Sequence, residues 1–331
     1  MKHENKEYVA DDQLLYCRSN MNILITGAEG FVGKNLVENF QRDAYSVLHP
    51  SVQELDLTCS QSVSSYLNDH AVDVIVHSAT TLRRGTDYPD DVCENNLRMF
   101  FNLVRAKRPS TKLINFGSGS EYSRKYWHAK MPETFFDHYV PDDSHSFSKY
   151  VISKYIDSCD VGEILTLRIF GIFGKYEDYK YKFLSNSISK NIMNIDIVIN
   201  QNVIYDYIYI DDFYRVVRHF VENNSSYKCY NVTPTQPIDL IEIANLINEV
   251  SDHKVPVVVL NDGVGVHYSG DNSRLMAELN GFSFMTYKDA ISDLYNYYRK
   301  NISMLDEIAL RNDDYLNYAK KLKTDYFAAK E

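Results

Sequence analysis

Short apolar runs alternate with segments of helical spacing along the first half of the chain. The runs have the length and the β-branched content of buried strands, and the helical segments carry apolar residues on one face. The predicted strands cover 21–26, 45–48, 72–76, 112–116 and 165–169, and the predicted helices cover 31–40, 92–106 and a segment around Lys149. Because strands that alternate with helices form βαβ units, the pattern predicts an α/β fold with a doubly wound parallel sheet.

This regularity weakens after Gly174, where a Tyr- and Lys-rich stretch, a strand-like segment at 203–210 and a helix from Asp212 follow. We therefore expect a smaller second lobe that exchanges segments with the first. The expected division is an N-terminal extension at 1–20, a dinucleotide-binding domain at 21–174 with a returning segment near 203–235, a substrate lobe at 175–202 and 236–300, and a C-terminal helical tail at 301–331.

Composition limits the classes of protein that fit this pattern. Hydrophobic residues make up 44% of the 331 residues and charged residues 24%, which excludes a disordered or fibrous chain. A formal net charge of -10 argues against nucleic acid or an anionic membrane as a partner. The five cysteines are widely spaced and form no C-x-x-C pair, so neither a disulfide framework nor a metal site is expected. A polar first 20 residues and the lack of a long apolar run lead us to expect a cytoplasmic protein.

A glycine-rich turn lies between the first predicted strand and the first predicted helix. Gly27, Gly30 and Gly33 stand at intervals of three residues, with Phe31 and Val32 before the last of them. Glycines in this position allow a tight turn, a close approach to a pyrophosphate and close packing of helix on strand. The free N–H groups and the dipole of the helix then favour phosphate, so the turn predicts dinucleotide binding.

The end of the second strand bears on which dinucleotide binds. An acidic residue about 20 positions after the glycines would bind the ribose hydroxyls of NAD, but this strand ends in His49, Pro50 and Ser51. With no carboxylate there to repel a 2′-phosphate, NADP(H) is slightly favoured over NAD(H), with His49 or Ser51 as the contact. The alternative, in which either cofactor binds and His49 is a surface residue, stays open.

Several segments in a fixed order resemble the extended short-chain dehydrogenases/reductases, the NAD-dependent epimerase/dehydratase family that acts on nucleotide sugars. The matching segments are G-x-x-G-x-x-G at 27–33, Asp56-Leu57, VDVIVHSAT at 72–80, Asn96, NFGSGSEY at 115–122, SKY at 148–150, LRIFGIFG at 167–174 and YDYIYIDD at 205–212. Their joint order and spacing are more specific than any single motif.

The resemblance implies a Rossmann-type cofactor domain, a smaller C-terminal substrate lobe, a nucleotide-sugar substrate, a homodimer and a role in polysaccharide biosynthesis. The cofactor contacts implied by the matching positions are Gly27, Gly30, Phe31, Val32, Gly33, His49, Ser51, Asp56, Leu57, Ser78, Ala79, Thr80, Asn96 and Lys149. The implied substrate contacts are Ser118, Ser120, Lys182 and Tyr205.

The family moves a hydride between nicotinamide C4 and a sugar carbon while a Ser or Thr, a Tyr and a Lys handle the hydroxyl proton. Ser118 occupies the serine position, and the match places Lys149 at the lysine position but His145 at the tyrosine position. Imidazole can also act as an acid or base near neutral pH. The catalytic residues expected from this register are therefore Ser118, His145 and Lys149.

An alternative register places a literal Y-x-x-x-K at Tyr150 and Lys154. Five residues turn a helix by about 500°, or about 140° net, so the two registers exclude each other. The 19 residues from Lys149 to Arg168 accommodate the rest of a helix, a return and the next strand, whereas Lys154 leaves 14. This spacing favours the first register.

Two further positions bear on the reaction and on the substrate. Gly119 and Ser120 stand where dehydratases of the family carry acidic residues, which argues against elimination of water. Reduction of a 4-keto nucleotide sugar is therefore the first expectation and C4 epimerisation the alternative. A non-catalytic dinucleotide-binding member is the third hypothesis, because the tyrosine position holds His145. Tyr205 stands where the family commonly has a pyrophosphate-binding arginine, and the candidates to replace that charge are Lys180, Lys182 and Lys190.

Overall fold

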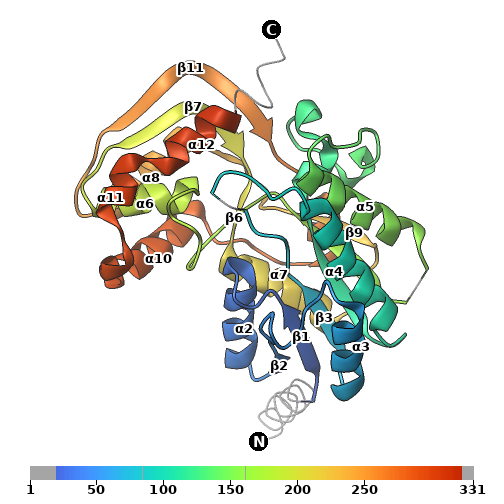
Figure 1. The fold of residues 1–331 in the computed structure, drawn as a ribbon. Helices are drawn as coiled ribbons and strands as arrows, with labels where there is room; N and C mark the ends of the chain where they lie inside the picture. Colours follow the sequence, from blue (N-terminus) through green and yellow to red (C-terminus); the bar gives the residue numbers. More distant parts are fainter. Residues whose placement is uncertain (1–19, 84, 161, 323–331) are drawn as a thin grey trace, which may run out of the picture. The chain divides into compact units, whose positions relative to one another are not determined.

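The computed structural model describes residues 20–83, 85–160 and 162–322, and these form two compact units (Figure 1). The first unit contains the described residues up to Gly117, together with Phe147–Leu167 and Val217–Cys229. The second contains Ser118–Ser146, Arg168–Val216 and the described residues from Tyr230 onward. Residues 1–19 of the expected N-terminal extension lie outside the described residues, and the expected domain boundaries stay a prediction.

A six-stranded sheet organises the dinucleotide-binding part of the fold. Its strands are β1 (Asn22–Thr26), β2 (Ser46–Leu48), β3 (Val74–His77), β4 (Lys112–Ser118), β5 (Ile164–Ile169) and β9 (Cys229–Val232), in the order β2-β1-β3-β4-β5-β9. β1 pairs in parallel with both β2 and β3, and β3 pairs in parallel with β4. This confirms the predicted α/β class with a parallel sheet. The strand order reverses at β1 and β3, and ligands of such sheets bind beyond the carboxyl ends of the strands at this point.

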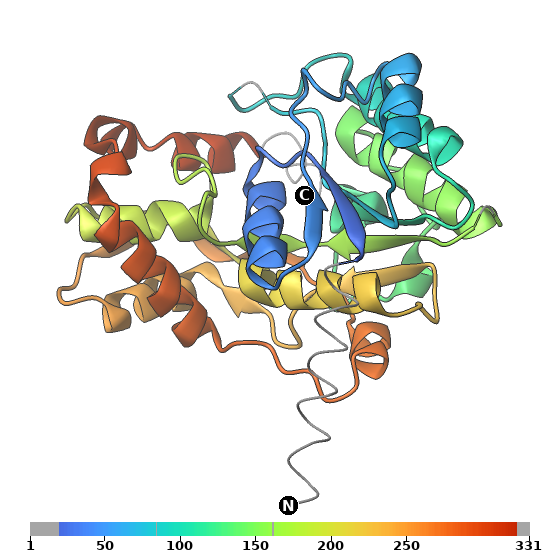
Figure 2. The ribbon, with the colours of Figure 1, turned by 90° about the horizontal axis from the view of Figure 1, so that it is seen from below.

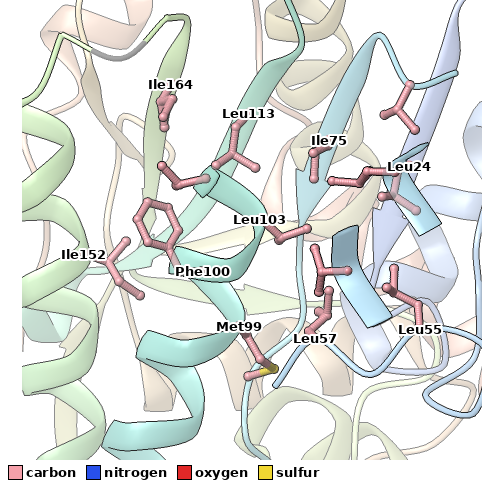
Figure 3. Packing of buried hydrophobic residues seen from close by; sticks show 14 of the residues in the cluster. Leu24, Leu55, Leu57, Ile75, Met99, Phe100, Leu103, Leu113, Ile152 and Ile164 are labelled. Atoms are coloured by element: carbon pink, nitrogen blue, oxygen red, sulfur yellow. The ribbon is translucent and has the colours of Figure 1, made fainter. Parts of the chain in front are cut away.

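One face of the sheet is covered by α3 (Ser60–Asp69), α4 (Val92–Ala106) and α5 (Ser144–Ser158). Figure 3 shows the buried cluster between them, in which Phe100 and Leu103 of α4 meet Leu24, Ile75 and Leu113 of the strands. These side chains are fully buried. The apolar stripe on each helix thus faces the apolar side chains of the strands, as the helical spacing in the sequence predicts.

Two more helices lie side by side, α2 (Phe31–Arg42) and the C-terminal part of α7 (Ile210–Glu222), as Figures 1 and 2 both show. Arg218 of α7 donates to Asp43 just beyond α2 at 2.8 Å. The Tyr45 hydroxyl donates to Glu222 at the end of α7.

The second unit has a smaller sheet with the order β10-β7-β11 and a two-stranded pair, β6 with β8. The strands are β6 (Gly171–Phe173), β7 (Ile197–Tyr205), β8 (Tyr207–Tyr209), β10 (Ile238–Asp239) and β11 (Val257–Tyr268). Its helices are α6 (Phe183–Ile192), α8 (Leu240–Val250), α9 (Ser273–Glu278), α10 (Tyr287–Lys300), α11 (Glu307–Asn312) and α12 (Asp314–Leu322). The short 3-10 helices are η1 (Gly119–Tyr122), η2 (Arg124–Tyr126), η3 (Glu133–Phe135) and η4 (Ile302–Met304).

The helices α6, α8 and α10 pack against one another, and α12 packs against β7. In the described part of the expected helical tail, the structure has η4, α11 and α12. None of the helices in the described ranges combines the length and the apolar character that crossing a bilayer requires.

Candidate active site

The glycine turn follows β1 directly and is too crowded for side chains. Gly27 has φ +68°, and a Cβ built on it would lie 2.7 Å from the Cα of Ala79. A Cβ on Gly33 would lie 2.2 Å from the carbonyl oxygen of Gly27. Both obstacles are backbone atoms, which cannot rotate away. The turn therefore needs glycine at both positions to hold helix α2 against the strand.

The N-terminus of α2 is built to receive an anion. Gly30 is the N-cap residue, and no side chain of the described residues caps the helix. The first N–H groups of a helix lack partners within it and carry the positive end of the helix dipole. Since α2 starts beyond the carboxyl end of β1, where the strand order reverses, the turn and the predicted helix residues Phe31 and Val32 fit the diphosphate of a dinucleotide.

The turn after β3 holds the predicted residues Ser78, Ala79 and Thr80, all half-buried. The Asn96 side chain organises this turn from α4: its Oδ1 accepts from the Thr81 amide at 2.8 Å and from the Thr80 hydroxyl at 3.4 Å. Its Nδ2 donates to the Ser148 hydroxyl on α5 at 3.0 Å. Asn96 therefore links the turn after β3 to the helix that carries Lys149.

Lys149 is buried near the carboxyl ends of β3 and β4. Its Nζ donates to the Phe116 carbonyl oxygen of β4 at 2.9 Å. Burial, and then the Lys149 charge, lower the pKa of His77 at the end of β3 to about 3. In the alternative register, Lys154 is exposed on α5, and the half-buried Tyr150 ring stacks on Phe147. The structure thus brings Lys149 to the strand ends and leaves Lys154 on the surface.

A carboxylate outside the matched motifs lies in the loop after β2. Glu54 accepts from the Ser51 amide at 2.7 Å and from the Ser51 hydroxyl at 2.9 Å. These hydrogen bonds lower the pKa of Glu54 below its ordinary value. His49 beside it is exposed. The negative charge of Glu54 is therefore hydrogen-bonded to Ser51, one of the two residues predicted to contact a 2′-phosphate.

Asp56 and Leu57 follow in the next turn. Asp56 Oδ1 accepts from the Thr58 amide at 2.9 Å and from its hydroxyl at 2.7 Å, and the Leu57 carbonyl oxygen accepts from Asn102 of α4 at 2.9 Å. These bonds fix the loop between β2 and α3.

In the second unit, Ser118 ends β4 and caps η1. Its Oγ accepts from the Ser120 amide at 3.1 Å and from the Ser120 hydroxyl at 2.9 Å. Its amide donates to Glu121 Oε1 at 2.7 Å, which completes a capping box. The structure thus brings the predicted residues Ser118 and Ser120 together in one rigid loop.

A buried ion pair supports this serine loop. Glu121 Oε2 accepts from Arg168 Nε at 2.8 Å, and the two side chains are 0% and 1% exposed. Arg168 also donates to the Tyr122 hydroxyl at 2.8 Å, and Tyr122 donates to Asn231 Oδ1 at 2.7 Å. The pair cannot be recognised from the two matched motifs that contain its residues, because Glu121 and Arg168 are 47 positions apart.

His145 lies in the first turn of α5 and is half-buried. Asp143 precedes the helix: its Oδ1 accepts from the Ser146 amide at 2.9 Å, and its Oδ2 lies 3.4 Å from Arg124 Nε. His145 stands four positions before Lys149, one helical turn away, so both residues are on the same side of α5.

The predicted substrate residues Tyr205 and Lys182 stand at the end of β7 and at the start of α6. Burial raises the pKa of Tyr205 to about 12, so this phenol is neutral at physiological pH. Lys182 is exposed. Lys190 instead is buried and pairs with Asp313 at 2.6 Å, and Lys180 lies 3.9 Å from Asp306. Of the three lysine candidates, Lys182 is the one without an ion pair to these C-terminal carboxylates.

Comparison with known proteins identifies relatives of similar length. GDP-6-deoxy-D-talose 4-dehydrogenase from Aggregatibacter actinomycetemcomitans is 25% identical over 297 residues, which are 83% of this chain and 97% of that protein. GDP-L-colitose synthase from Yersinia pseudotuberculosis is 33% identical over 109 residues, which span 31% of this chain and 35% of that protein. The solved GDP-mannoheptose C4 reductase from Campylobacter jejuni, with NADP bound, superposes with a TM-score of 0.72 at 20% identity, over 85% of this chain and 99% of that one.

The solved neighbour shares the Rossmann-type α/β fold expected from the sequence. The model of the NAD dependent epimerase/dehydratase family matches residues 23–233, which contain the glycine turn, the serine loop and Lys149. The family predicted from the ordered motifs is therefore confirmed, and the chain belongs to the NAD dependent epimerase/dehydratase family.

Proposed function

We propose that this protein is an NAD(P)-dependent oxidoreductase that reduces the 4-keto group of a nucleotide sugar. The observation that carries the proposal is the placement of two features on one parallel sheet. A glycine turn without room for side chains follows β1, and the buried Lys149 ammonium lies at the carboxyl end of β4. The ribose hydroxyls of a dinucleotide held at the first can accept hydrogen bonds, and the Lys149 ammonium is a donor for them.

The nicotinamide dinucleotide supplies the hydride when it is bound, and the residues of this chain bind the cofactor, orient the sugar and move the proton. The turn from Gly27 to Gly33 binds the diphosphate, and Lys149 binds the nicotinamide ribose. Ser118 orients the sugar oxygen, because its Oγ already accepts two hydrogen bonds and retains its own proton to donate. His145 relays a proton in the position where the family has a tyrosine.

Reduction at C4 is favoured over the other reactions of the family. Gly119 and Ser120 offer no carboxylate to remove a proton from the sugar or to protonate a leaving hydroxyl. One relative that is similar over nearly its whole length is a 4-dehydrogenase of a GDP-linked sugar, and one solved neighbour is a C4 reductase. C4 epimerisation is the second candidate, because it uses the same hydride transfer twice. A non-catalytic dinucleotide-binding protein is the third, because of His145.

The cofactor is a nicotinamide dinucleotide, with NADP(H) slightly favoured over NAD(H). The lack of a carboxylate at 49–51 and the NADP bound in the solved neighbour support NADP(H). Glu54 weakens this preference, because its carboxylate is hydrogen-bonded to Ser51 and would repel a 2′-phosphate there. The substrate diphosphate is held by Lys182 in place of the arginine that Tyr205 replaces.

The same family resemblance supports a homodimer in the cytoplasm that serves polysaccharide biosynthesis. The acidic net charge of -10 agrees with a small-molecule substrate rather than nucleic acid or a membrane surface.

The test is consumption of NADPH and of NADH by the purified protein with GDP- and dTDP-linked 4-keto-6-deoxy sugars. We expect turnover with at least one of them, and His145→Ala should remove most of it. Lys149→Met should lower turnover far more than Lys154→Met if the first register holds, and the reverse order would support the second. Cofactor binding without turnover on any keto sugar would favour the non-catalytic alternative.

A further inference from the structure

Tyr268 ends β11 with its hydroxyl against the serine loop. The side chain is 5% exposed. A Cβ built on Gly119, the residue after Ser118, would lie 2.3 Å from the Tyr268 hydroxyl oxygen. Only a glycine at this position of the loop lets the phenol come so close. The sequence motifs give Tyr268 no role.

The ring of Tyr268 is fixed by aromatic neighbours of the second unit. It stacks on Trp127 with 3.8 Å between ring centroids and an interplanar angle of 24°, and it lies 4.9 Å from the Phe170 ring. Tyr268 is also the register partner of Tyr205 on β7. Because the ring is held on several sides, the direction of its hydroxyl is fixed.

Burial and neighbouring polar groups act on the pKa of the Tyr268 phenol. Burial raises its pKa above the ordinary value, while the Arg124 cation and a hydrogen bond with the Ser118 side chain act in the opposite direction. The phenol therefore keeps its proton at physiological pH. The Ser118 Oγ accepts from the amide and hydroxyl of Ser120, so it too has a proton to donate. Two neutral hydroxyls thus stand side by side at the end of β4, and the hydrogen bond between them uses one of their two protons until a ligand oxygen replaces that contact.

We propose that Tyr268 is a further catalytic residue, which donates a hydrogen bond to the sugar carbonyl oxygen together with Ser118 and gives that oxygen its proton. This inference rests on the proposed reduction. The carbonyl carbon gains the hydride, the C=O π bond breaks, and its electron pair stays on oxygen. That oxygen takes the phenol proton, and the resulting phenolate recovers a proton from water. The sugar is reduced, and the dihydronicotinamide is oxidised.

His145 stands at the position where the family has its catalytic tyrosine. With this assignment, Tyr268 supplies the phenol that this position lacks. A neutral phenol suits reduction, because the acid must be protonated before hydride arrives. His145 keeps its role as a proton relay by passing a proton from water to the Tyr268 phenolate, so the loss of either residue lowers turnover.

Tyr268→Phe keeps the ring and its stacking on Trp127 and removes only the hydroxyl. We expect kcat for the 4-keto sugar to fall by about 100-fold or more, the usual contribution of a placed proton donor, with KM changed by about threefold at most. The matched control is Tyr295→Phe, whose buried hydroxyl contacts Ser251 away from the loop and whose loss should leave kcat unchanged. A Tyr268→Phe variant with kcat within about threefold of the wild type overturns the proposal.

A second readout needs no turnover. A ring-fluorinated tyrosine is placed at position 268, and fluorine NMR is recorded while a GDP- or dTDP-linked sugar is added without cofactor. A shift of the resonance with added nucleotide sugar, absent when the same label stands at position 295, supports contact between the phenol and the ligand. No shift at saturating sugar nucleotide overturns the proposal. Lack of wild-type turnover would refute the proposed reduction, and the fluorine signal would still decide whether Tyr268 meets the ligand.

Discussion

The buried pair of Glu121 and Arg168 gives the sharpest prediction on how the serine loop is held. In Arg168→Met, the Glu121 carboxylate stays fully buried, with the Ser118 amide at 2.7 Å as its remaining partner among the bonds described. The Tyr122 hydroxyl also loses the donor that stands at 2.8 Å. Removal of one partner from a buried ion pair costs about 3–5 kcal/mol, because the other charge is left uncompensated.

The assay is urea unfolding of Arg168→Met, of Glu121→Gln and of the double variant, followed by circular dichroism. We expect the single Arg168→Met change to lower the free energy of unfolding by about 3 kcal/mol or more, and the double variant to lose less than the sum of the two by about 1 kcal/mol or more. A loss below about 1 kcal/mol for Arg168→Met, or strictly additive losses, would refute the reasoning.

Two further predictions concern the cofactor site, and a third concerns stability at low pH. Gly33→Ala should abolish NAD(P)H binding, measured by fluorescence titration, because the new Cβ would meet the Gly27 oxygen at 2.2 Å; near-normal affinity would contradict this. Glu54→Gln should raise the affinity for NADP(H) relative to NAD(H), measured by calorimetry, since it removes the charge on Ser51; an unchanged ratio would show that the 2′-phosphate lies elsewhere. Because the pKa of buried His77 is lowered to about 3, the unfolded chain takes up a proton that the folded chain does not as the pH falls below about 6.5. The free energy of unfolding should therefore fall with pH over this window by up to about 1.4 kcal/mol per unit, and His77→Gln should remove that part of the slope.

Strand periodicity alone located most of the parallel sheet. The predicted strands at 21–26 and 165–169 are β1 (Asn22–Thr26) and β5 (Ile164–Ile169), which differ from the prediction by one residue at an end. Their apolar runs are continuous because both faces of the sheet are buried, and such runs are easily recognised. Helix α3 (Ser60–Asp69) was missed, because only Val63 and Leu67 of its ten residues are buried and the rest is polar.

The site was less accessible to sequence reasoning where it depends on contacts between distant residues. The glycine turn and Lys149 lie inside local motifs and were identified from them. Glu54 was overlooked, although Ser51 and Glu54 have the S-x-x-E spacing of a capping box, in which the glutamate accepts from the serine amide. The contact of Tyr268 with the loop at Gly119 brings the end of β11 to the end of β4, two strands far apart in the sequence, and no local motif encodes it.

Lys190 shows that a charged residue cannot be assumed to lie on the surface. A lysine between two polar stretches suggests a solvated face, but Lys190 is 2% exposed and pairs with Asp313 next to α12. The partner belongs to the C-terminal segment, which has no counterpart among the matched motifs. The pairing removes Lys190 from the candidates for the substrate diphosphate, and of the other two lysines Lys182 is the exposed one.

Transfer of deuterium to the sugar tests the central claim most directly. The protein is incubated with a 4-keto nucleotide sugar and with NADPH or NADH deuterated at nicotinamide C4, on each face in separate runs, and the product is analysed by NMR and mass spectrometry. The account predicts one deuterium at C4 of the sugar from one of the two faces, with oxidised cofactor in equal amount. A protein that binds the cofactor yet leaves every keto sugar free of deuterium would contradict it.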